Sequence, residues 1–335
     1  MTGPAFITGG SGFVGGAVLA QLVADGREVR ALARSAEAAT SVEAAGARPV
    51  RGDLFDVQAL LEGMRGCETV FHVAGVNAMC RRDPGAMLHT NVEGSDVVVR
   101  AAAAVGARRL VLTSSAATIG EPAGIVGRED TPHRGTFLSD YERSKFLAEQ
   151  RVLAVGEELE IEVVCVNPSS VQGPGRSDGS ARILIRLVDA RLPFIVNTHL
   201  SIVDVQDCTQ AHISAESRGT AGRRYVVNGV SLPARRAMEL LRAVAGRPRR
   251  AIRLPRIVAT AAGVVGSGIN TATGRSIPFC PELARTLLHG HRYDGSSATR
   301  ELGLTYRPIE DTIERTLRWY ADRGVIRPLP TGGVP

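Results

Sequence analysis

Short apolar runs alternate with alanine-rich helical patterns along the first half of the chain, and this alternation limits the possible folds most strongly. Short buried strands that alternate with helices form βαβ units, which build a parallel sheet covered by helices on both faces. The pattern therefore predicts an α/β fold with a doubly wound parallel sheet. The expected strands are residues 5–8, 29–33, 48–51, 69–74, 109–114 and 162–167, and the expected helices are 12–24, 57–64, 91–105 and 139–155.

A glycine-rich turn joins the first strand to the first helix, in the sequence Thr8-Gly-Gly-Ser-Gly-Phe-Val-Gly15. Glycine permits a tight turn and a close backbone approach, and a helix N-terminus presents free N–H groups and a positive dipole to a pyrophosphate. The spacing GxxGxxG is longer at its first interval than the usual dinucleotide fingerprint, but its place between strand and helix favours the same use. We expect a dinucleotide cofactor on a Rossmann-type domain, bound by Gly9, Ser11, Gly12, Phe13 and Val14.

The second strand ends at Arg34, where a carboxylate normally binds the ribose 2′-hydroxyl of the cofactor. An arginine favours a 2′-phosphate through a charge-assisted hydrogen bond, so we predict NADP(H) over NAD(H). A solvated surface arginine is the alternative. Asp53 and Leu54 follow the third strand, and Asp53 is placed to accept from the adenine amino group, with a helix N-cap as its alternative role.

Tyr141 and Lys145 lie four residues apart in a helical pattern, so their side chains share one face. A phenol with a pKa of about 10 is a poor acid or base at neutral pH, and a neighbouring ammonium beside a positive nicotinamide can lower that pKa. Thr113-Ser-Ser115 lies upstream, at the carboxyl end of a predicted parallel strand, where doubly wound folds bind ligands. A serine there can hold the substrate oxygen. We predict Ser115, Tyr141 and Lys145 as catalytic residues, with Ser114 as the alternative serine.

These motifs resemble those of the extended short-chain dehydrogenases/reductases, the NAD(P)-dependent epimerase/dehydratase family. The matching pieces run in order through the first half: Thr8 to Gly15, Gly52-Asp-Leu54, His72-Val-Ala-Gly75, Asn91-Val-Glu-Gly94, Thr113-Ser-Ser115, Tyr141 with Lys145, and Asn167-Pro168. Other stretches are similar to a branch of dihydroflavonol reductase-like and hopanoid-associated sugar epimerase-like proteins: Arg82-Asp-Pro84, Ser144 to Glu149, Glu301 to Leu304, and Trp319-Tyr320.

The resemblance implies hydride transfer at the nicotinamide C4 carbon, with Tyr141 as general acid/base and Lys145 on the nicotinamide ribose. It also implies that Ala74, Gly75 and Pro168 line the cofactor. In relatives, the helices flanking the sheet commonly form dimers, so we expect a homodimer.

Two departures from the family narrow the substrate. Nucleotide-sugar epimerases resemble one another in an Arg-Asp-Phe stretch where this chain reads His199 to Asp204, and sugar 4,6-dehydratases carry Thr-Asp-Glu in place of Thr113-Ser-Ser115. A nucleotide-diphosphate substrate and dehydration are therefore disfavoured. Apolar segments at 183–188, 192–196 and 257–265 are available to wall a pocket, so we predict a largely apolar alcohol or ketone. The alternative is that these segments are merely core.

Two loops, 76–81 and 173–180, are expected to face the substrate. Two other functions stay open. One is an epimerase, acting on a sugar or nucleotide sugar, that retains its NAD(H). The other is a non-catalytic protein that senses dinucleotides.

The loop at 173–180 is rich in Gly, Pro and Ser and indicates a domain border. At 335 residues, the chain exceeds the length at which single cores stop growing. We predict a Rossmann domain at residues 1–169, to which a strand at 225–228 returns. Residues 170–335 then form a smaller, partly discontinuous domain that mainly binds substrate.

Composition bears on partners and compartment. The net charge is +6, but aromatic residues make up only 4% and most basic residues are spread out, so we expect no nucleic-acid partner. The arginine cluster at 247–256 is expected to be a solvated surface segment, with contact to an anionic substrate or lipid as the alternative.

Five cysteines without CxxC spacing argue against disulfides and zinc sites, and they indicate free thiols in the cytoplasm, with no metal site. The first strand begins at residue 5, which leaves no room for a signal peptide. The apolar stretch 257–269 is too short to span a bilayer and is expected to be a packed helix or loop, so no integral membrane segment is predicted.

Overall fold

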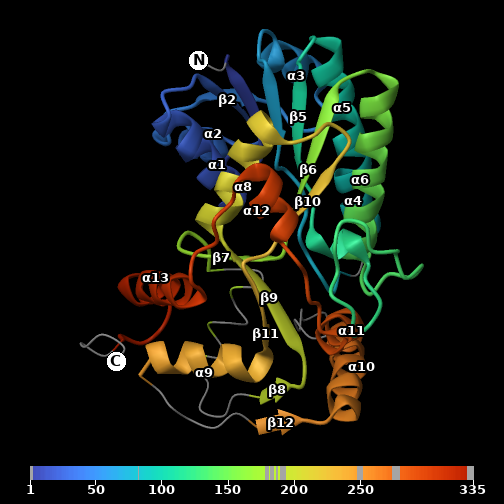
Figure 1. Cartoon of the computed structure of the whole chain (residues 1–335), viewed down its shortest axis with the longest axis vertical. Helices are drawn as coiled ribbons and strands as arrows, with labels where there is room; N and C mark the ends of the chain where they lie inside the picture. Colours follow the sequence, from blue (N-terminus) through green and yellow to red (C-terminus); the bar gives the residue numbers. More distant parts are fainter. Residues whose placement is uncertain are drawn as a thin grey trace.

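The computed structural model places a helix-covered sheet beside a smaller group of strands and helices from the later part of the chain (Figure 1). It describes residues 3–81, 83–177, 181, 185, 188, 194–246, 252–273 and 280–329.

A parallel sheet forms the larger part, and the predicted doubly wound fold is confirmed. Across the described residues it has seven strands in the order β10-β6-β5-β4-β1-β2-β3, each pair parallel. Because the order reverses between β1 and β4, their carboxyl ends flank the crevice in which such folds bind ligands. The strands are β1 (Ala5–Thr8), β2 (Val29–Ala33), β3 (Arg48–Arg51), β4 (Thr69–His72), β5 (Arg109–Thr113), β6 (Glu162–Pro168) and β10 (Arg224–Val227).

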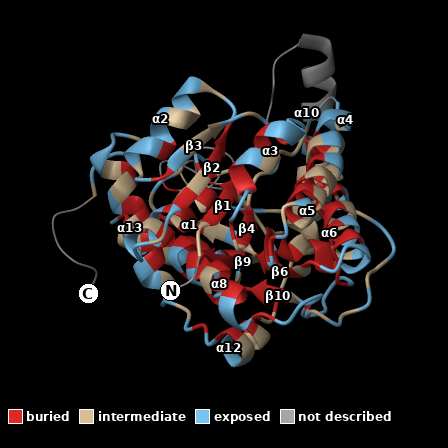
Figure 2. Cartoon of the chain, turned by 90° about the horizontal axis from the view of Figure 1, so that it is seen from above, coloured by how far each residue is buried: buried red, intermediate tan, exposed pale blue. Residues whose placement is uncertain are grey.

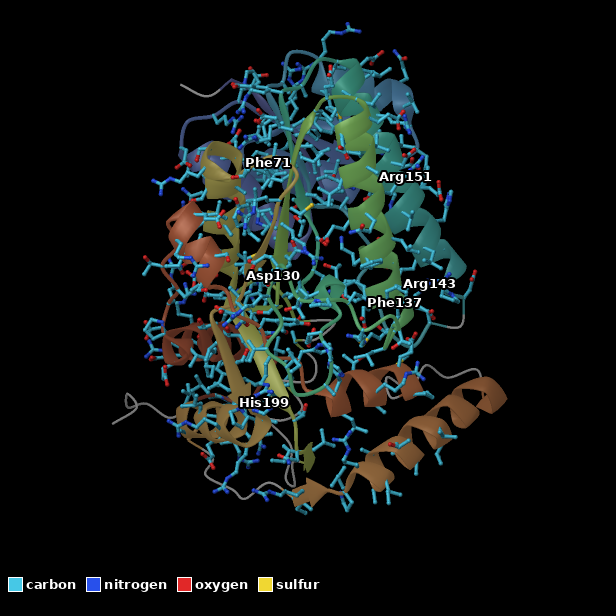
Figure 3. All side chains as sticks on the ribbon, turned by 45° about the vertical axis from the view of Figure 1, so that its right-hand side comes forward. Phe71, Asp130, Phe137, Arg143, Arg151 and His199 are labelled. Atoms are coloured by element: carbon cyan, nitrogen blue, oxygen red, sulfur yellow. A yellow bond between two sulfur atoms is a disulfide. The ribbon has the colours of Figure 1, made fainter. Side chains whose placement is uncertain are left out.

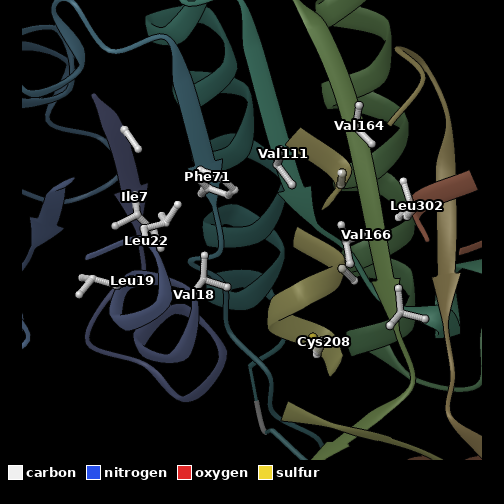
Figure 4. Close-up of a cluster of buried hydrophobic side chains, with 14 of the residues drawn as sticks. Ile7, Val18, Leu19, Leu22, Phe71, Val111, Val164, Val166, Cys208 and Leu302 are labelled. Carbon is white, nitrogen blue, oxygen red and sulfur yellow. The ribbon is translucent and has the colours of Figure 1, made fainter. Parts of the chain in front are cut away.

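Helices cover both faces of this sheet, because successive strand residues point to opposite sides. In β1, Ile7 packs in one buried apolar cluster with side chains of α1, α8 and α12, whereas its neighbour Phe6 packs in another with side chains of α3, α5 and α6. Figure 4 shows the first cluster, and Figure 2 shows that buried residues concentrate between the two helix layers. The helices of this part are α1 (Phe13–Ala24), α2 (Ala36–Ala44), α3 (Val57–Met64), α4 (Gly85–Leu88), α5 (Gly94–Ala104), α6 (Asp140–Glu158), α8 (Val205–Arg218) and α12 (Ser296–Leu302), with a π-helix at His89–Glu93 and a 3₁₀ helix at Ala116–Ile119.

Helix α6 begins at a defined cap, which fixes the position of Tyr141 in its first turn. Ser139 has extended backbone, and its hydroxyl accepts a hydrogen bond from the Glu142 N–H at 3.1 Å. A cap of this kind stabilises a helix by about 1 kcal/mol.

The smaller part is built on short strands, with a core of its own. β7 (Ser170–Gln172), β9 (His199–Asp204) and β11 (Val230–Pro233) form one sheet, and β8 (Phe194–Val196) pairs with β12 (Ile252–Leu254). Leu241 and Leu317 are buried together with Tyr320 in its core. Its helices are α9 (Ala234–Val244), α10 (Arg256–Thr273), α11 (Pro281–His289) and α13 (Ile309–Asp322). No helix of the described chain has the length and apolar character to cross a bilayer.

The expectation of five free thiols is wrong, because Cys80 and Cys280 form a disulfide. They are 200 residues apart in sequence, and the fold brings α11 back against the loop after β4. The spacing of the cysteines in the sequence cannot predict a contact between residues so far apart. Cys67, Cys165 and Cys208 are free and buried, and burial raises the pKa of each thiol.

Candidate functional site

The glycine turn is a backbone cradle that side chains would fill. Gly9 has φ +75°, and its carbonyl accepts from the Gly12 N–H at 2.9 Å. A Cβ at Gly15 would lie 2.1 Å from the Gly9 oxygen, which only glycine avoids. Gly12 caps α1 without a side-chain hydrogen bond, and the first turn holds no acid. The free N–H groups and the helix dipole therefore fit a pyrophosphate.

This turn packs directly against the end of β4. A Cβ at Gly9 would lie 2.7 Å from the Ala74 nitrogen, and Ala74 donates to the Thr8 hydroxyl at 3.2 Å. Behind them, His72 bridges Thr8 at 2.7 Å and Ser95 at 2.8 Å through its two ring nitrogens. Burial lowers the pKa of His72 to about 3, so the ring is neutral at physiological pH. This buried relay holds the two strand ends that flank the cofactor crevice.

Lys145 reaches the same crevice from α6. Its Nζ donates to the Thr113 carbonyl oxygen at 2.7 Å and lies 3.8 Å from where a Cβ on Gly75 would stand. Burial lowers the pKa of Lys145 to about 8, although the nearby Glu149 carboxylate acts in the opposite direction. Lys145 is the only lysine in the sequence. An arginine here would stay charged at any working pH, so only lysine supplies an ammonium that can lose its proton.

Tyr141 and Ser115 contact each other near Lys145. A hydrogen bond with Ser115 lowers the pKa of Tyr141, but burial raises it by more, so the phenol is protonated at neutral pH. Lys145 is not among the causes of this shift, and its ammonium donates to the Thr113 carbonyl oxygen. The expected lowering by Lys145 together with a bound nicotinamide stays a prediction. Ser115, not Ser114, is the serine that contacts Tyr141, since the Ser114 hydroxyl is buried without a partner among the described residues.

Asn91 lies in the motif Asn91-Val-Glu-Gly94, but the sequence predicts no role for its side chain. It is 2% exposed, and its amide group bonds both the N–H of Val76 at 2.7 Å and the C=O of Val76 at 3.0 Å. The same amide nitrogen donates to Ser144 Oγ at 2.9 Å. Asn91 thus ties the loop after β4 to α6 next to Lys145.

The remaining predicted cofactor residues lie along the carboxyl edge of the sheet. Arg34 is exposed directly after β2, and Pro168 is buried at the end of β6. Asp53 is exposed and accepts from the Phe55 N–H at 2.8 Å, whereas the N-cap of α3 is Asp56. The helix-cap alternative for Asp53 is therefore wrong. Leu54 is buried and packs against Gly94.

The two loops expected to face the substrate approach the site where they are described. The Arg176 guanidinium stacks on Phe13 of the glycine turn, 4.8 Å from the ring centroid. Residues 178–180 lie outside the described part. The loop 76–81 is held at Val76 by Asn91 and at Cys80 by the disulfide.

Three apolar segments, 183–188, 192–196 and 257–265, are expected from the sequence to wall a substrate pocket. In segment 257–265 Ala259 and Gly263 are buried, but Ile257 is 83% exposed and Val264 and Val265 are 60% exposed, so this segment does not wall a pocket. Of segment 183–188, Ile185 and Val188 are described and pack in the core of the smaller part. Segment 192–196 is described from residue 194, where it forms β8.

A polar cluster next to this site could not be predicted from the sequence, because its members come from distant segments. The carboxylate of Glu121, 1% exposed, accepts from His291 at 2.6 Å and lies 3.5 Å from His289. Burial alone would raise the pKa of Glu121, but hydrogen bonds from the two histidines lower it to about 2. Its second oxygen has no partner among the described residues. Tyr293 bonds His291 at 2.9 Å and lies near enough to Tyr141 to interact electrostatically.

The geometry defines a dinucleotide-dependent enzyme, and comparison with known proteins gives its family. The chain matches the NAD dependent epimerase/dehydratase family over residues 5–227 and belongs to that family. It is an NAD(P)-dependent oxidoreductase of the extended short-chain dehydrogenase type.

The similar proteins include reductases. A dihydroflavonol 4-reductase-like protein of Synechocystis sp. is 29% identical over 331 residues, covering 96% of both chains. The 2-alkyl-3-oxoalkanoate reductase of Stenotrophomonas maltophilia is 32% identical over 254 residues, covering 72% of this chain and 76% of that one. The crystal structure of gox2253 matches with a TM-score of 0.85 at 27% identity, covering 97% and 99%.

Proposed function

We propose that the chain transfers a hydride between NADP(H) and a largely apolar alcohol or ketone, with Ser115, Tyr141 and Lys145 as catalytic residues. The observation that carries this proposal is the contact of Ser115 with Tyr141 beside a buried Lys145 that reaches the Gly75 edge of the cofactor crevice.

In the reductive direction, a nicotinamide held at this crevice would supply a hydride to the carbonyl carbon of the substrate. Ser115 holds the carbonyl oxygen by a hydrogen bond. Tyr141 gives its phenolic proton to that oxygen as the C=O π bond becomes a C–H and an O–H bond, and the phenolate later regains a proton from solvent. Burial raises the pKa of Tyr141, so the phenol is protonated and has a proton to give. The positive charges of Lys145 and a bound nicotinamide would lower this pKa towards the working pH. Lys145 would hold the nicotinamide ribose with the Nζ hydrogens that are not bonded to Thr113.

We infer that the cofactor is NADP(H). Arg34 is exposed where the ribose 2′ position is expected, and Arg51 ends the neighbouring strand in register with Ala33. Two guanidinium groups at adjacent strand ends favour a phosphate. Gly9, Ser11, Gly12, Phe13 and Val14 would hold the pyrophosphate, Asp53 and Leu54 the adenine, and Ala74, Gly75 and Pro168 the nicotinamide half.

The substrate proposal rests on similarity and on the polar cluster. The relative named 2-alkyl-3-oxoalkanoate reductase supports a ketone with an alkyl chain. The unpartnered oxygen of Glu121, in a cluster that reaches Tyr141 through Tyr293, supports a single hydrogen-bond donor on an otherwise apolar substrate. A Glu121→Gln variant should raise KM for hydroxylated ketones and leave KM for their unsubstituted analogues unchanged.

The decisive experiment follows NADPH absorbance while ketones of increasing alkyl length are added. Turnover that Tyr141→Phe abolishes supports the proposal. Purified protein that carries NAD(H) tightly, epimerises a sugar and consumes no added NADPH would instead favour the epimerase. The solved structures named as epimerases do not decide this, since at 18% identity they share the fold. Unchanged cellular function in Tyr141→Phe would favour a dinucleotide sensor.

We propose residues 1–169, with β10, as the dinucleotide-binding domain and 170–335 as mainly substrate-binding. We also propose a homodimer through the sheet-flanking helices. The outward side of α6 carries exposed Arg143 and Arg151 (Figure 3), and Arg151 pairs with Asp96 of α5. Sedimentation velocity tests this, since charge reversal at Arg143 should shift the dimer towards monomer.

We propose a cytoplasmic location, which the free thiols of Cys67, Cys165 and Cys208 support. The Cys80–Cys280 disulfide argues against it, because disulfides are rare in that compartment.

A further inference from the structure

Helix α10 uses its small residues, not its large ones, to pack on the protein. Ala259 is 2% exposed, and a Cβ on Gly263 would lie 3.1 Å from the Cys280 carbonyl oxygen and 3.2 Å from the Ala284 Cβ of α11. The side of α10 that meets α11 is therefore made by alanine and glycine.

The opposite side of α10 is apolar and faces solvent. Ile257, Ala261, Val264 and Val265 are spaced as positions i, i+4, i+7 and i+8, which share one face of a helix, and all four are exposed. Figure 3 shows α10 as an outermost helix of the molecule, beyond α11. A helix of a globular protein normally turns such a stripe inward, and exposed stripes of this kind mark interaction sites.

Positive charge is concentrated in the stretch of sequence that contains this stripe. Residues 247–280 contain six arginines and no acidic residue, and the net charge of the whole chain is +6, so the rest of the chain is neutral overall. Of these, Arg253 and Arg256 are exposed in the described part, at the N-terminal end of α10. Cations at a helix N-terminus oppose the helix dipole, so they do not serve the stability of this helix.

Helix α10 is linked to the catalytic site through α11. Glu282 of α11 accepts from the Asp140 N–H at 2.9 Å, one residue before Tyr141, and from the Cys80 N–H at 3.0 Å. The Cys80–Cys280 disulfide fixes the start of α11 to the same loop. Helix α10, which carries the apolar stripe on its outer side, is therefore held through α11 near the start of α6 and the loop after β4.

We propose that α10 docks the enzyme on an anionic lipid surface, with its apolar stripe in the headgroup region and its flanking arginines on lipid phosphates. This inference rests on the proposed function in one respect: an apolar substrate would enter the site from that surface. Amphipathic helices with basic flanks bind lipid in this way, and each arginine near such a surface strengthens binding several-fold. A second copy of the chain is a poorer occupant, because it would bring an equal set of arginines against the first.

The test is flotation of the full chain with vesicles of phosphatidylcholine alone or mixed with phosphatidylglycerol. We expect binding to the anionic vesicles, weakened by salt, and about tenfold weaker binding in two double variants. These are Ile257→Ser with Val264→Ser, and Arg253→Gln with Arg256→Gln. The matched controls are Val57→Ser with Leu159→Ser, and Arg235→Gln with Arg236→Gln, all at exposed positions elsewhere, and they should bind like the wild type.

Three outcomes would overturn the proposal: no binding of the wild type to anionic vesicles, unchanged binding of both α10 variants, or a stripe variant that turns a dimer into a monomer without any vesicle binding. Reduction of a water-soluble ketone by NADPH should be equal in all these proteins. If no ketone is reduced while vesicle binding follows the expected pattern, the proposed function fails and the docking surface stands.

Discussion

The Nζ atom of Lys145 donates a hydrogen bond to the carbonyl oxygen of Thr113 at 2.7 Å, which joins α6 to the last residue of β5. This contact and its burial give a pH-dependent contribution to stability. The pKa of Lys145 is about 8 in the folded chain and about 10.5 when unfolded. The unfolded state therefore binds more protons between these values, and stability rises as pH increases from 8 to 10.5.

Lys145→Met removes this titration. Relative to the variant, the wild type should gain about 3 kcal/mol of unfolding free energy between pH 7 and pH 10.5. Urea unfolding of both proteins across this range measures the difference. A constant difference would show that Lys145 titrates normally. Lys145→Arg should lose turnover at every pH, because the guanidinium stays charged and cannot reproduce the single Nζ contact.

His72 should make the fold sensitive to acid. Its pKa falls from 6.5 to about 3 on burial. Between these pH values the unfolded chain therefore binds a proton at His72 that the folded chain does not bind. Stability is therefore lost as pH falls from 6.5 towards 3, by about 2 kcal/mol at pH 5. His72→Gln should flatten this dependence, whereas the exposed control His89→Gln should leave it unchanged. Equal slopes for all three proteins in urea titrations at pH 5 and pH 7 would contradict the buried neutral ring.

The Arg34→Ala substitution should change the affinity for NADPH and not the affinity for NADH. Loss of a charge-assisted hydrogen bond to a 2′-phosphate weakens NADPH binding by about 10- to 100-fold and leaves NADH binding unchanged. Fluorescence titration with each cofactor measures both affinities. Arg48→Ala, at the start of β3 and away from the carboxyl edge, is the control. Equal affinity for both cofactors in the wild type would remove the NADP(H) proposal.

The disulfide should be measurable by thiol counting and by stability. Denatured protein should show three reactive thiols without reductant and five after reduction. A double variant, Cys80→Ser with Cys280→Ser, should lose about 2–5 kcal/mol of unfolding free energy in urea, because the link closes a loop of 200 residues. Five reactive thiols in unreduced protein would contradict the disulfide.

The sequence was sufficient for the sheet because its signals are local. The alternation around Phe6 and Ile7 predicts a strand buried on both faces, and the glycines at 9, 12 and 15 act within one turn. The four-residue spacing of Tyr141 and Lys145 is equally local, since one helix face presents both.

The unpredicted features depend on contacts between distant segments. Glu121 meets His289 and His291, and Cys80 meets Cys280, only after α11 has folded against the sheet domain. The apolar pattern of 257–265 is the same for a helix buried in a pocket and for one facing solvent. Its exposure follows from α11 covering the alanine and glycine side alone.

Lys145, the single lysine of the chain, is a specific target for chemical labelling. Apart from a terminal amine, a reagent that acylates amines finds one target, and a pKa of about 8 leaves part of its population nucleophilic in mildly alkaline buffer. The rate of acylation at Lys145 would then report directly how open the catalytic crevice is, and protection by a dinucleotide would reveal occupancy without any turnover assay.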